Sequence, residues 1–168
     1  MNNKTLYSEK RIQKKVYILA NQIHKAKIDD PVILIVLDGA MFFATDLLKA
    51  LSYWDIYPEI ETVQIKSYKK NRIQGRIRLL KKWKNSLKNR NVIIVEDIID
   101  SGKTVDFLIK KLKKKSVKKV FTASLLKRQG CDVFIDFLGF IVKKNVWVVG
   151  YGLDNNNKQR SLQEIIEL

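Results

Sequence analysis

Residues 91–104, NVIIVEDIIDSGKT, decide both the fold and the kind of site that the sequence predicts. Residues 92–95 form an apolar, strand-like run. Residues 32–37 form another, β-branched in most positions, which is typical of a strand buried on both faces of a parallel sheet. Glu96 and Asp97 follow at once, and Asp100 stands beside a small glycine-containing turn. Carboxylates so close to a buried strand are costly unless something neutralises or uses them. The pattern therefore predicts a strand that ends before Glu96 and a ligand site just beyond it.

The rest of the chain alternates between helical and strand-like patterns. Residues 8–27 carry apolar side chains at helical spacing, with Ser8 as the predicted N-cap. Residues 67–88 are polar and basic, so we expect a long loop that is either a functional lid or disordered. The other predicted elements are helices at 40–51 and after Thr104, and strands at 32–37, 60–66, 120–126, 137–142 and 146–149.

Strands that alternate with helices indicate right-handed βαβ units, and hence an α/β fold with a mostly parallel sheet. No internal repeat and no Pro/Gly-rich linker divides the sequence. We therefore expect one domain spanning residues 1–168.

The composition excludes several classes of site. Cys131 is the only cysteine and His24 the only histidine. The sequence thus has no disulfide framework, no zinc-type spacing and no Ser-His-Asp relay unless His24 serves it. The N-terminus lacks the apolar core of a signal peptide, and no apolar run approaches the roughly 18 residues of a membrane span. We expect a cytoplasmic protein without a membrane partner.

The formal net charge of +16 suits nucleic acid, a polyphosphate substrate or an anionic surface. Residues 110–119 favour a simpler interpretation, because their lysines fall around a predicted helix C-terminus, where cations are favoured. We interpret the charge as general surface background, with nucleic acid a possible but not an expected partner.

The turn after Asp97 predicts a phosphate site. In open parallel sheets, ligands bind outside the carboxyl ends of the strands. Free backbone N–H groups at the start of the next helix favour an anion, Gly102 allows close approach, and the hydroxyls of Ser101 and Thr104 can donate. The letters GKT suggest a nucleotide-binding P-loop, but that motif requires glycine where this chain has Asp97.

The paired acids Glu96 and Asp97 point to more than phosphate, because two carboxylates repel an anion. They suit hydroxyl groups or a metal ion, and a phosphorylated sugar offers hydroxyls beside a phosphate. An ordinary strand-to-helix turn with an acidic N-cap remains the alternative at this point.

The stretch VIIVEDIIDSGKT resembles the phosphoribosyl-diphosphate signature of type I phosphoribosyltransferases, specifically the hypoxanthine-guanine branch. Four further segments extend the resemblance over roughly residues 32–162. It implies a type I phosphoribosyltransferase fold: a central, mostly parallel sheet flanked by helices, with a small hood. It also implies purine salvage. A 5-phosphoribosyl group would pass from phosphoribosyl diphosphate to N9 of a 6-oxopurine, giving IMP or GMP and pyrophosphate, with Mg²⁺ as cofactor and a homodimer or homotetramer as the assembly.

The resemblance assigns roles around the signature. Glu96 and Asp97 would hold the ribose hydroxyls and, with Asp154, magnesium. Asp100 would be the general acid/base at N7 of the purine. The 5-phosphate would be bound by Asp100, Ser101, Gly102, Lys103 and Thr104.

The other four segments complete the implied site. VLDGAMFFATDLL is similar to the family's pyrophosphate loop, with an unusual peptide conformation after Leu37, although Asp38 stands where the family often has lysine. KSY followed by Gly75 resembles the mobile loop. In ASLLKR the purine's 6-oxo contact falls on Arg128 without gaps, or on Lys127 one residue earlier. WVVGYGLDNNNKQR is similar to the base-stacking and metal segment. The implied residues are Leu37, Asp38, Gly39, Ala40 and Arg160 for pyrophosphate, Ser67 and Tyr68 in the mobile loop, and Arg128, Lys127, Trp147 and Val148 for the purine.

Three other functions remain open on the sequence alone. The enzyme could prefer xanthine. The chain could be an RNA-binding regulator of pyrimidine genes on the same scaffold, which the positive charge favours. It could also be a catalytically inactive ligand sensor.

Overall fold

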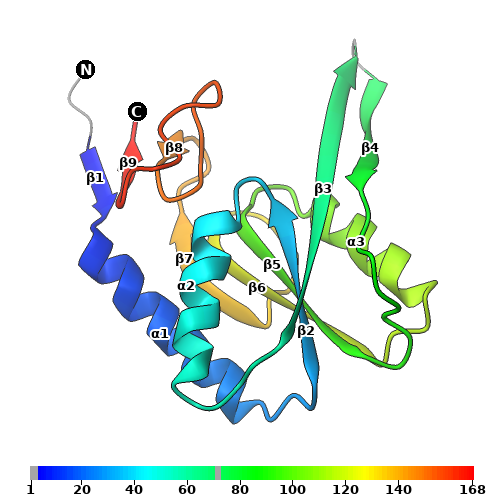
Figure 1. The fold of residues 1–168 in the computed structure, drawn as a ribbon. Helices are drawn as coiled ribbons and strands as arrows, with labels where there is room; N and C mark the ends of the chain where they lie inside the picture. The colour runs from blue at the N-terminus through cyan, green and yellow to red at the C-terminus, as the bar shows by residue number, and fades with distance from the viewer. Residues whose placement is uncertain (1–3, 71–72) are drawn as a thin grey trace.

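The computed structural model describes residues 4–70 and 73–168. A six-stranded sheet in the order β4-β3-β2-β5-β6-β7 forms the centre, and a separate three-stranded sheet β1-β9-β8 forms a hood beside it (Figure 1). All pairings of the large sheet are parallel except that of β3 with β4. The predicted α/β fold, with a mostly parallel sheet and a small hood, is confirmed.

The bounds of the elements are β1 Lys4–Tyr7, α1 Glu9–Lys25, β2 Pro31–Leu37, α2 Met41–Ser52, β3 Glu59–Lys70, β4 Ile73–Lys81, β5 Asn91–Ile99, α3 Lys103–Lys113, β6 Lys119–Arg128, β7 Phe137–Val142, β8 Val148–Val149 and β9 Ile165–Glu167.

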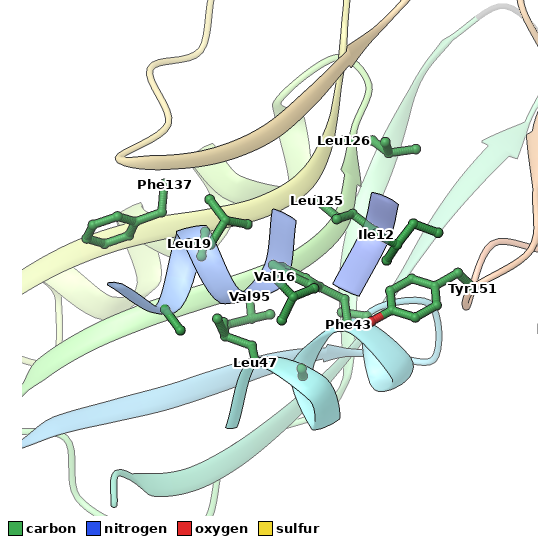
Figure 2. Close-up of a cluster of buried hydrophobic side chains, with 14 of the residues drawn as sticks. Ile12, Val16, Leu19, Phe43, Leu47, Val95, Leu125, Leu126, Phe137 and Tyr151 are labelled. Carbon is green, nitrogen blue, oxygen red and sulfur yellow. The ribbon is translucent and has the colours of Figure 1, made fainter. Parts of the chain in front are cut away.

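The helices cover the two faces of the large sheet separately. α1 buries the apolar stripe that its spacing predicts, and Ser8 is its N-cap, in an extended conformation. Figure 2 shows Val16 of α1 and Leu47 of α2 packed with Val95 of β5. On the opposite face, α3 packs against the alternate side chains of β2 and β5, among them Ile94. The sheet is thus buried on both faces, as its β-branched strands predict.

The prediction of a long loop at residues 67–88 is wrong for its first part. β3 continues to Lys70, and β4 returns antiparallel to it, so that Ser67 pairs with Ile77. The cause is the strand-like alternation in β4, where Ile77 and Leu79 are partly buried and Arg78 and Leu80 are exposed. The side chains of Ser67 and Tyr68 lie outside the described residues.

Two other expectations need correction. β5 does not end before Glu96 but runs to Ile99, because β6 continues to pair with it. The hood strands β1 and β9 were not predicted, since each has at most four residues and their partners lie at opposite ends of the chain. No helix in the described part of the chain is long and apolar enough to cross a membrane.

Candidate active site

The candidate site begins where β2 stops pairing with β5. β2 pairs with β5 as far as Val95, whereas β6 pairs with β5 up to Ile99. Residues 96–99 are therefore paired with a neighbouring strand on one side only. This leaves the side chains of Glu96 and Asp97 partly buried at the edge of a cleft.

Three hollows that are lined by Glu96 or Asp97 surround this end of β5, and a wider hollow of about 670 Å³ lies beside them against Asp100, Ser101 and Arg128. The largest of the three, about 460 Å³, is lined by Leu37, Asp38, Gly39, Glu96, Asp97, Thr104, Asp154 and Arg160, together with residues of the β3–β4 hairpin. The second, about 230 Å³, is lined by Asp97, Asp100, Arg128, Trp147, Val148 and Asp154, with Ile98 and Leu153. The third, about 80 Å³, is formed by residues 98–105 and Glu96.

The hollows share carboxylates. Asp97 and Asp154 line both the first and the second, Glu96 lines the first and the third, and Asp100 lines the second and the third. A molecule that fills all three would therefore pass directly over the acidic end of β5.

The carboxyl groups at this end of β5 have raised pKa values, because burial disfavours their charged forms. Burial raises the pKa of the Glu96 carboxyl well above its usual value, and the Asp97 charge raises it further. One oxygen of Glu96, Oε2, is buried without a hydrogen-bond partner among the described residues. Burial also raises the pKa of Asp97 to about 6, although backbone N–H groups and Arg160 act in the opposite direction. Such acids suit a ligand that brings positive charge or hydroxyl donors.

Two glycines bring three separate segments to the same point. A Cβ on Gly39 would lie 2.1 Å from a carboxylate oxygen of Asp97, and a Cβ on Gly152 would lie 2.0 Å from the carbonyl oxygen of Gly39. Only glycine allows these approaches. The loop after β2, the acids of β5 and the loop after β8 are therefore in direct contact.

The loop after β2 lines the cleft. The Leu37–Asp38 peptide bond is cis, and the sequence resemblance implies an unusual conformation at this peptide. Leu37, Asp38 and Gly39 line the largest hollow. Ala40 does not, because it is buried and its N–H donates to the Val36 carbonyl at 3.2 Å.

Arg160 and Asp154 form the far wall of the cleft. The Arg160 guanidinium pairs with Asp154 at 2.9 Å and donates to the Gly152 carbonyl at 2.7 Å. Asp154 also accepts a hydrogen bond from the backbone N–H of Asn157 at 2.8 Å. The pair therefore places one cation and one anion in the wall of the cleft.

The described residues contain no cluster of three His, Cys, Asp or Glu side chains that alone could hold a metal ion. Mg²⁺ takes few protein carboxylates and completes its shell with water and phosphate oxygens. The unpartnered Glu96 oxygen and the carboxylates of Asp97 and Asp154 are hard oxygen donors around one cleft.

The side chains of the last two residues of β6 have different surroundings. Arg128 lines the second hollow, where its Nε donates to Asp100 at 3.2 Å and its Nη1 donates to the Lys143 and Val146 carbonyls. Lys127 instead donates to the Val133 carbonyl at 2.8 Å, away from that hollow. The structure therefore brings Arg128, and not Lys127, beside Trp147.

The turn 101–104 forms the smallest hollow at the start of α3. Gly102 has φ +75°, a left-handed conformation that favours glycine, and a Cβ there would also meet Val133. Ser101 and Lys103 are exposed, and the N-terminus of the helix opens toward the hollow. Backbone N–H groups in this position attract anions.

Comparison with known proteins identifies the family. The model of the phosphoribosyl transferase domain matches residues 2–156. The chain belongs to the phosphoribosyltransferase family. The hypoxanthine-guanine-xanthine phosphoribosyltransferase of Tritrichomonas foetus is 35% identical over 96% of this chain and 89% of its own length. The hypoxanthine-guanine phosphoribosyltransferase of Bacillus subtilis is 35% identical over 96% and 91%.

A crystal structure of a Bacillus anthracis hypoxanthine-guanine phosphoribosyltransferase has a TM-score of 0.88 and 31% identity, covering 98% of both chains. The chain also matches a quarter of the bifunctional protein TilS/HprT of Listeria innocua, at 38% identity. The resemblance to the hypoxanthine-guanine branch is thus confirmed over almost the whole chain, and the protein is a phosphoribosyltransferase of that branch.

Sequence reasoning missed one support of this phosphoribosyltransferase site. The hydroxyl of Tyr151 donates to Asp46 of α2 at 2.6 Å, and Gln13 of α1 donates to the same carboxylate oxygen at 2.8 Å. Burial and the Asp46 hydrogen bond raise the pKa of Tyr151. Tyr151 precedes Gly152, so the bond ties the loop after β8 to the helix that follows the loop after β2. No local pattern marks Asp46 as its partner.

Proposed function

We propose that the protein transfers the 5-phosphoribosyl group of phosphoribosyl diphosphate to N9 of hypoxanthine or guanine. The products are IMP or GMP and pyrophosphate, and Mg²⁺ is the cofactor. The observation that carries the proposal is the set of three hollows joined by shared carboxylates at the end of β5. Their order, from an anion-binding turn through paired acids to an aromatic pocket, follows the order of phosphate, ribose and base in the product.

Each hollow suits one part of the substrates. The turn 101–104 binds the 5-phosphate through backbone N–H groups and hydroxyls. Glu96 and Asp97 accept hydrogen bonds from the two ribose hydroxyls. Arg160 and the backbone around Gly39 receive the pyrophosphate, which fits the position of both in the largest hollow.

The reaction needs stabilisation of two developing charges. The bond between ribose C1 and the diphosphate oxygen breaks, and its electron pair leaves with pyrophosphate. Positive charge builds on the ribose, and the N9 lone pair forms the new C1–N9 bond. Arg160 stabilises the leaving group, whereas the carboxylates of Glu96 and Asp97 stabilise the positive charge on the ribose. The partial burial of these groups strengthens both effects.

Glu96, Asp97 and Asp154 supply the oxygen donors that would hold Mg²⁺, together with water and substrate oxygens. When bound, Mg²⁺ neutralises negative charge on the diphosphate oxygens. The Asp38 carboxylate accepts a hydrogen bond from Gln64 at 3.5 Å in the same hollow. Neutralisation of the diphosphate by Mg²⁺ would let this acid remain beside the leaving group.

Asp100 acts as the general acid/base at N7 of the purine, which makes N9 more nucleophilic as the N9 bond forms. Its hydrogen bond from Arg128 Nε fixes the carboxylate. Trp147 is 61% exposed beside this hollow and offers its ring for stacking. Arg128 donates to the 6-oxo group of the base, and the backbone of Val148 meets the base edge.

The β3–β4 hairpin closes over the substrates and excludes water from the cationic ribose. Gln64 and Ile65 of β3 and Leu80 of β4 line the largest hollow, which supports this role. Ser67 and Tyr68, further along β3, belong to the same closing segment. The single domain 1–168, the homodimer or homotetramer and the cytoplasmic location stay predictions.

The test is nucleotide formation from phosphoribosyl diphosphate and Mg²⁺, with hypoxanthine, guanine, xanthine and adenine offered separately. We expect product with hypoxanthine and guanine and none with adenine, because a cationic donor matches a 6-oxo group and not a 6-amino group. A preference for xanthine would keep the reaction but change the base assignment. Absence of product with every base, from protein shown to be folded by circular dichroism, would contradict the proposal.

A further inference from the structure

The excess positive charge of the chain is confined to two segments, residues 62–95 and 107–131. Together they hold 20 of the 33 Lys and Arg residues and none of the 17 Asp and Glu residues. The rest of the chain carries 13 Lys and Arg against 17 Asp and Glu, and so has a net charge of −4. A uniform background would leave acids throughout. The charge is therefore segregated, contrary to the interpretation from composition.

The two segments meet in the fold. The N–H of Asn89 donates to the Ser116 carbonyl at 2.9 Å, and the N–H of Lys118 donates to the Arg90 carbonyl at 2.8 Å. Trp83 and Leu87, from the first of these segments, also join the apolar cluster under α3. Residues 81–90 and 110–119 thus form one continuous surface, which we call the basic end.

The cations of the basic end have little internal compensation. Within the described residues, its only ion pairs join Arg90 to Asp30 and Glu59, and Lys118 to Asp29 at 3.8 Å. Eleven of its cations are exposed lysines, namely Lys81, Lys82, Lys84, Lys88, Lys110, Lys111, Lys113, Lys114, Lys115, Lys118 and Lys119.

The nearby buried carboxylate does not neutralise these lysines. Glu61 accepts hydrogen bonds from the backbone N–H groups of Lys84 and Asn85, at 2.9 and 2.8 Å. It therefore fixes the backbone of this segment and leaves the ammonium groups of the lysines directed to solvent.

Most of the basic end lies at the opposite end of the strands from the candidate active site. Residues 84–90 lead into the start of β5 and residues 113–118 into the start of β6 (Figure 1). The three hollows lie at the carboxyl ends of these strands. Lys81 is the exception, because it pairs with Gln64 beside the largest hollow. Nine strand residues span about 30 Å. The substrate phosphates at the far end therefore do not account for this charge.

We propose that the basic end binds the phosphodiester backbone of a nucleic acid without reading its base sequence. Its exposed cations are all lysines, which bind phosphate as point charges, whereas base readout commonly uses the planar arginine fork. An anionic membrane fits less well. Surface helices on membranes insert apolar side chains, and none of the large exposed apolar residues lies within 81–90 or 110–119.

The experiment measures binding of the full chain to a labelled single-stranded RNA and a labelled DNA duplex, each about 20 nucleotides or base pairs long, by fluorescence anisotropy between about 50 and 200 mM salt. The basic-end variant carries Lys84→Gln, Lys114→Gln and Lys115→Gln. The matched control carries Lys4→Gln, Lys10→Gln and Lys14→Gln, which removes the same charge from exposed positions of β1 and α1. Circular dichroism verifies folding of all three proteins.

Each phosphate contact contributes about 0.7 to 0.9 to the slope of log affinity against log salt. The basic-end variant lacks three lysines, so we expect the magnitude of its slope to be smaller by about 2 to 3. The slope of the control should be almost unchanged. Equal losses in the two variants would overturn the proposal, because binding would then follow diffuse net charge. So would absence of binding to both nucleic acids at about 50 mM salt, or binding to phosphatidylserine vesicles in place of nucleic acid. The experiment measures binding and not phosphoribosyl transfer, so its outcome does not depend on whether the proposed function is correct.

Discussion

The strand β5 is paired on both sides along residues 91–95 and on one side along residues 96–99. In the first half every side chain is buried, and those of residues 92–95 are apolar. In the second half Glu96 and Asp97 are partly buried carboxyls with raised pKa values. The first half of β5 therefore contributes to stability, and the second half presents two acids whose charged forms are disfavoured by burial.

The difference shows how the fold makes room for chemistry. β2 turns away after Leu37, so its loop can approach Asp97 instead of continuing the sheet. The apolar half of β5 can then anchor carboxyls that would be unfavourable elsewhere. We expect substitutions in the first half to act on folding and substitutions beyond Val95 to act on catalysis.

The largest effect is expected for Asp100→Asn, at the end of the second half. Loss of the general acid/base should lower turnover by about 10²–10⁴-fold while folding is unchanged, because the side chain is 74% exposed. Initial rates of IMP formation measure this. Asp106→Asn, an exposed acid in the first turn of α3, is the matched control and should retain its rate. A loss under threefold for Asp100→Asn would remove it from the acid/base role.

In the first half, Ile94→Ala should lower the free energy of unfolding by about 2–5 kcal/mol, because it leaves a cavity in the fully buried cluster under α3. Ile98→Ala is the matched change in the second half and should cost less than half as much, since Ile98 is only partly buried. Urea denaturation of both variants measures the contrast. Equal losses would mean that the two halves do not differ in their contribution to stability.

Asp97→Asn should stabilise the protein in EDTA. The folded pKa of about 6 lies above the ordinary value of 3.8, so the folded state binds the proton more tightly than the unfolded state. The free energy of unfolding must then fall as the pH rises from about 4 to about 7. Asparagine removes this loss, which we expect to be about 1–3 kcal/mol at pH 8, while activity falls. If the variant and the unchanged protein show the same pH dependence of unfolding, the pKa of Asp97 is not raised by folding.

The sequence predicted most of the large sheet because its elements are long and periodic. The apolar stripe of α1 and the β-branched run of β2 were placed to within a few residues. The prediction failed where tertiary pairing overrides local pattern. β5 continues through two acids because β6 pairs with it, and β4 formed where polarity suggested a loop.

Most predicted site residues meet in space because their segments follow the carboxyl ends of adjacent strands, which is a rule of the fold. The sequence could not predict the contacts between those segments. Gly39 and Gly152 approach each other from loops more than 100 residues apart, and Tyr151 finds Asp46 on another element. Such contacts depend on the relative position of the hood and the large sheet, which no local pattern encodes.

The smallest effect concerns β6, whose last residues pair with the second half of β5. Lys127 and Arg128 alternate in direction, and only Arg128 lines the hollow beside Trp147. Arg128→Ala should therefore raise the KM for hypoxanthine by about tenfold, which corresponds to one lost hydrogen bond. Lys127→Ala should leave this KM within about twofold and act mainly on stability, because the only hydrogen bond of its ammonium among the described residues is to the Val133 carbonyl. The reverse result would mean that the base contact falls one residue earlier and that the end of β6 rearranges when the purine binds.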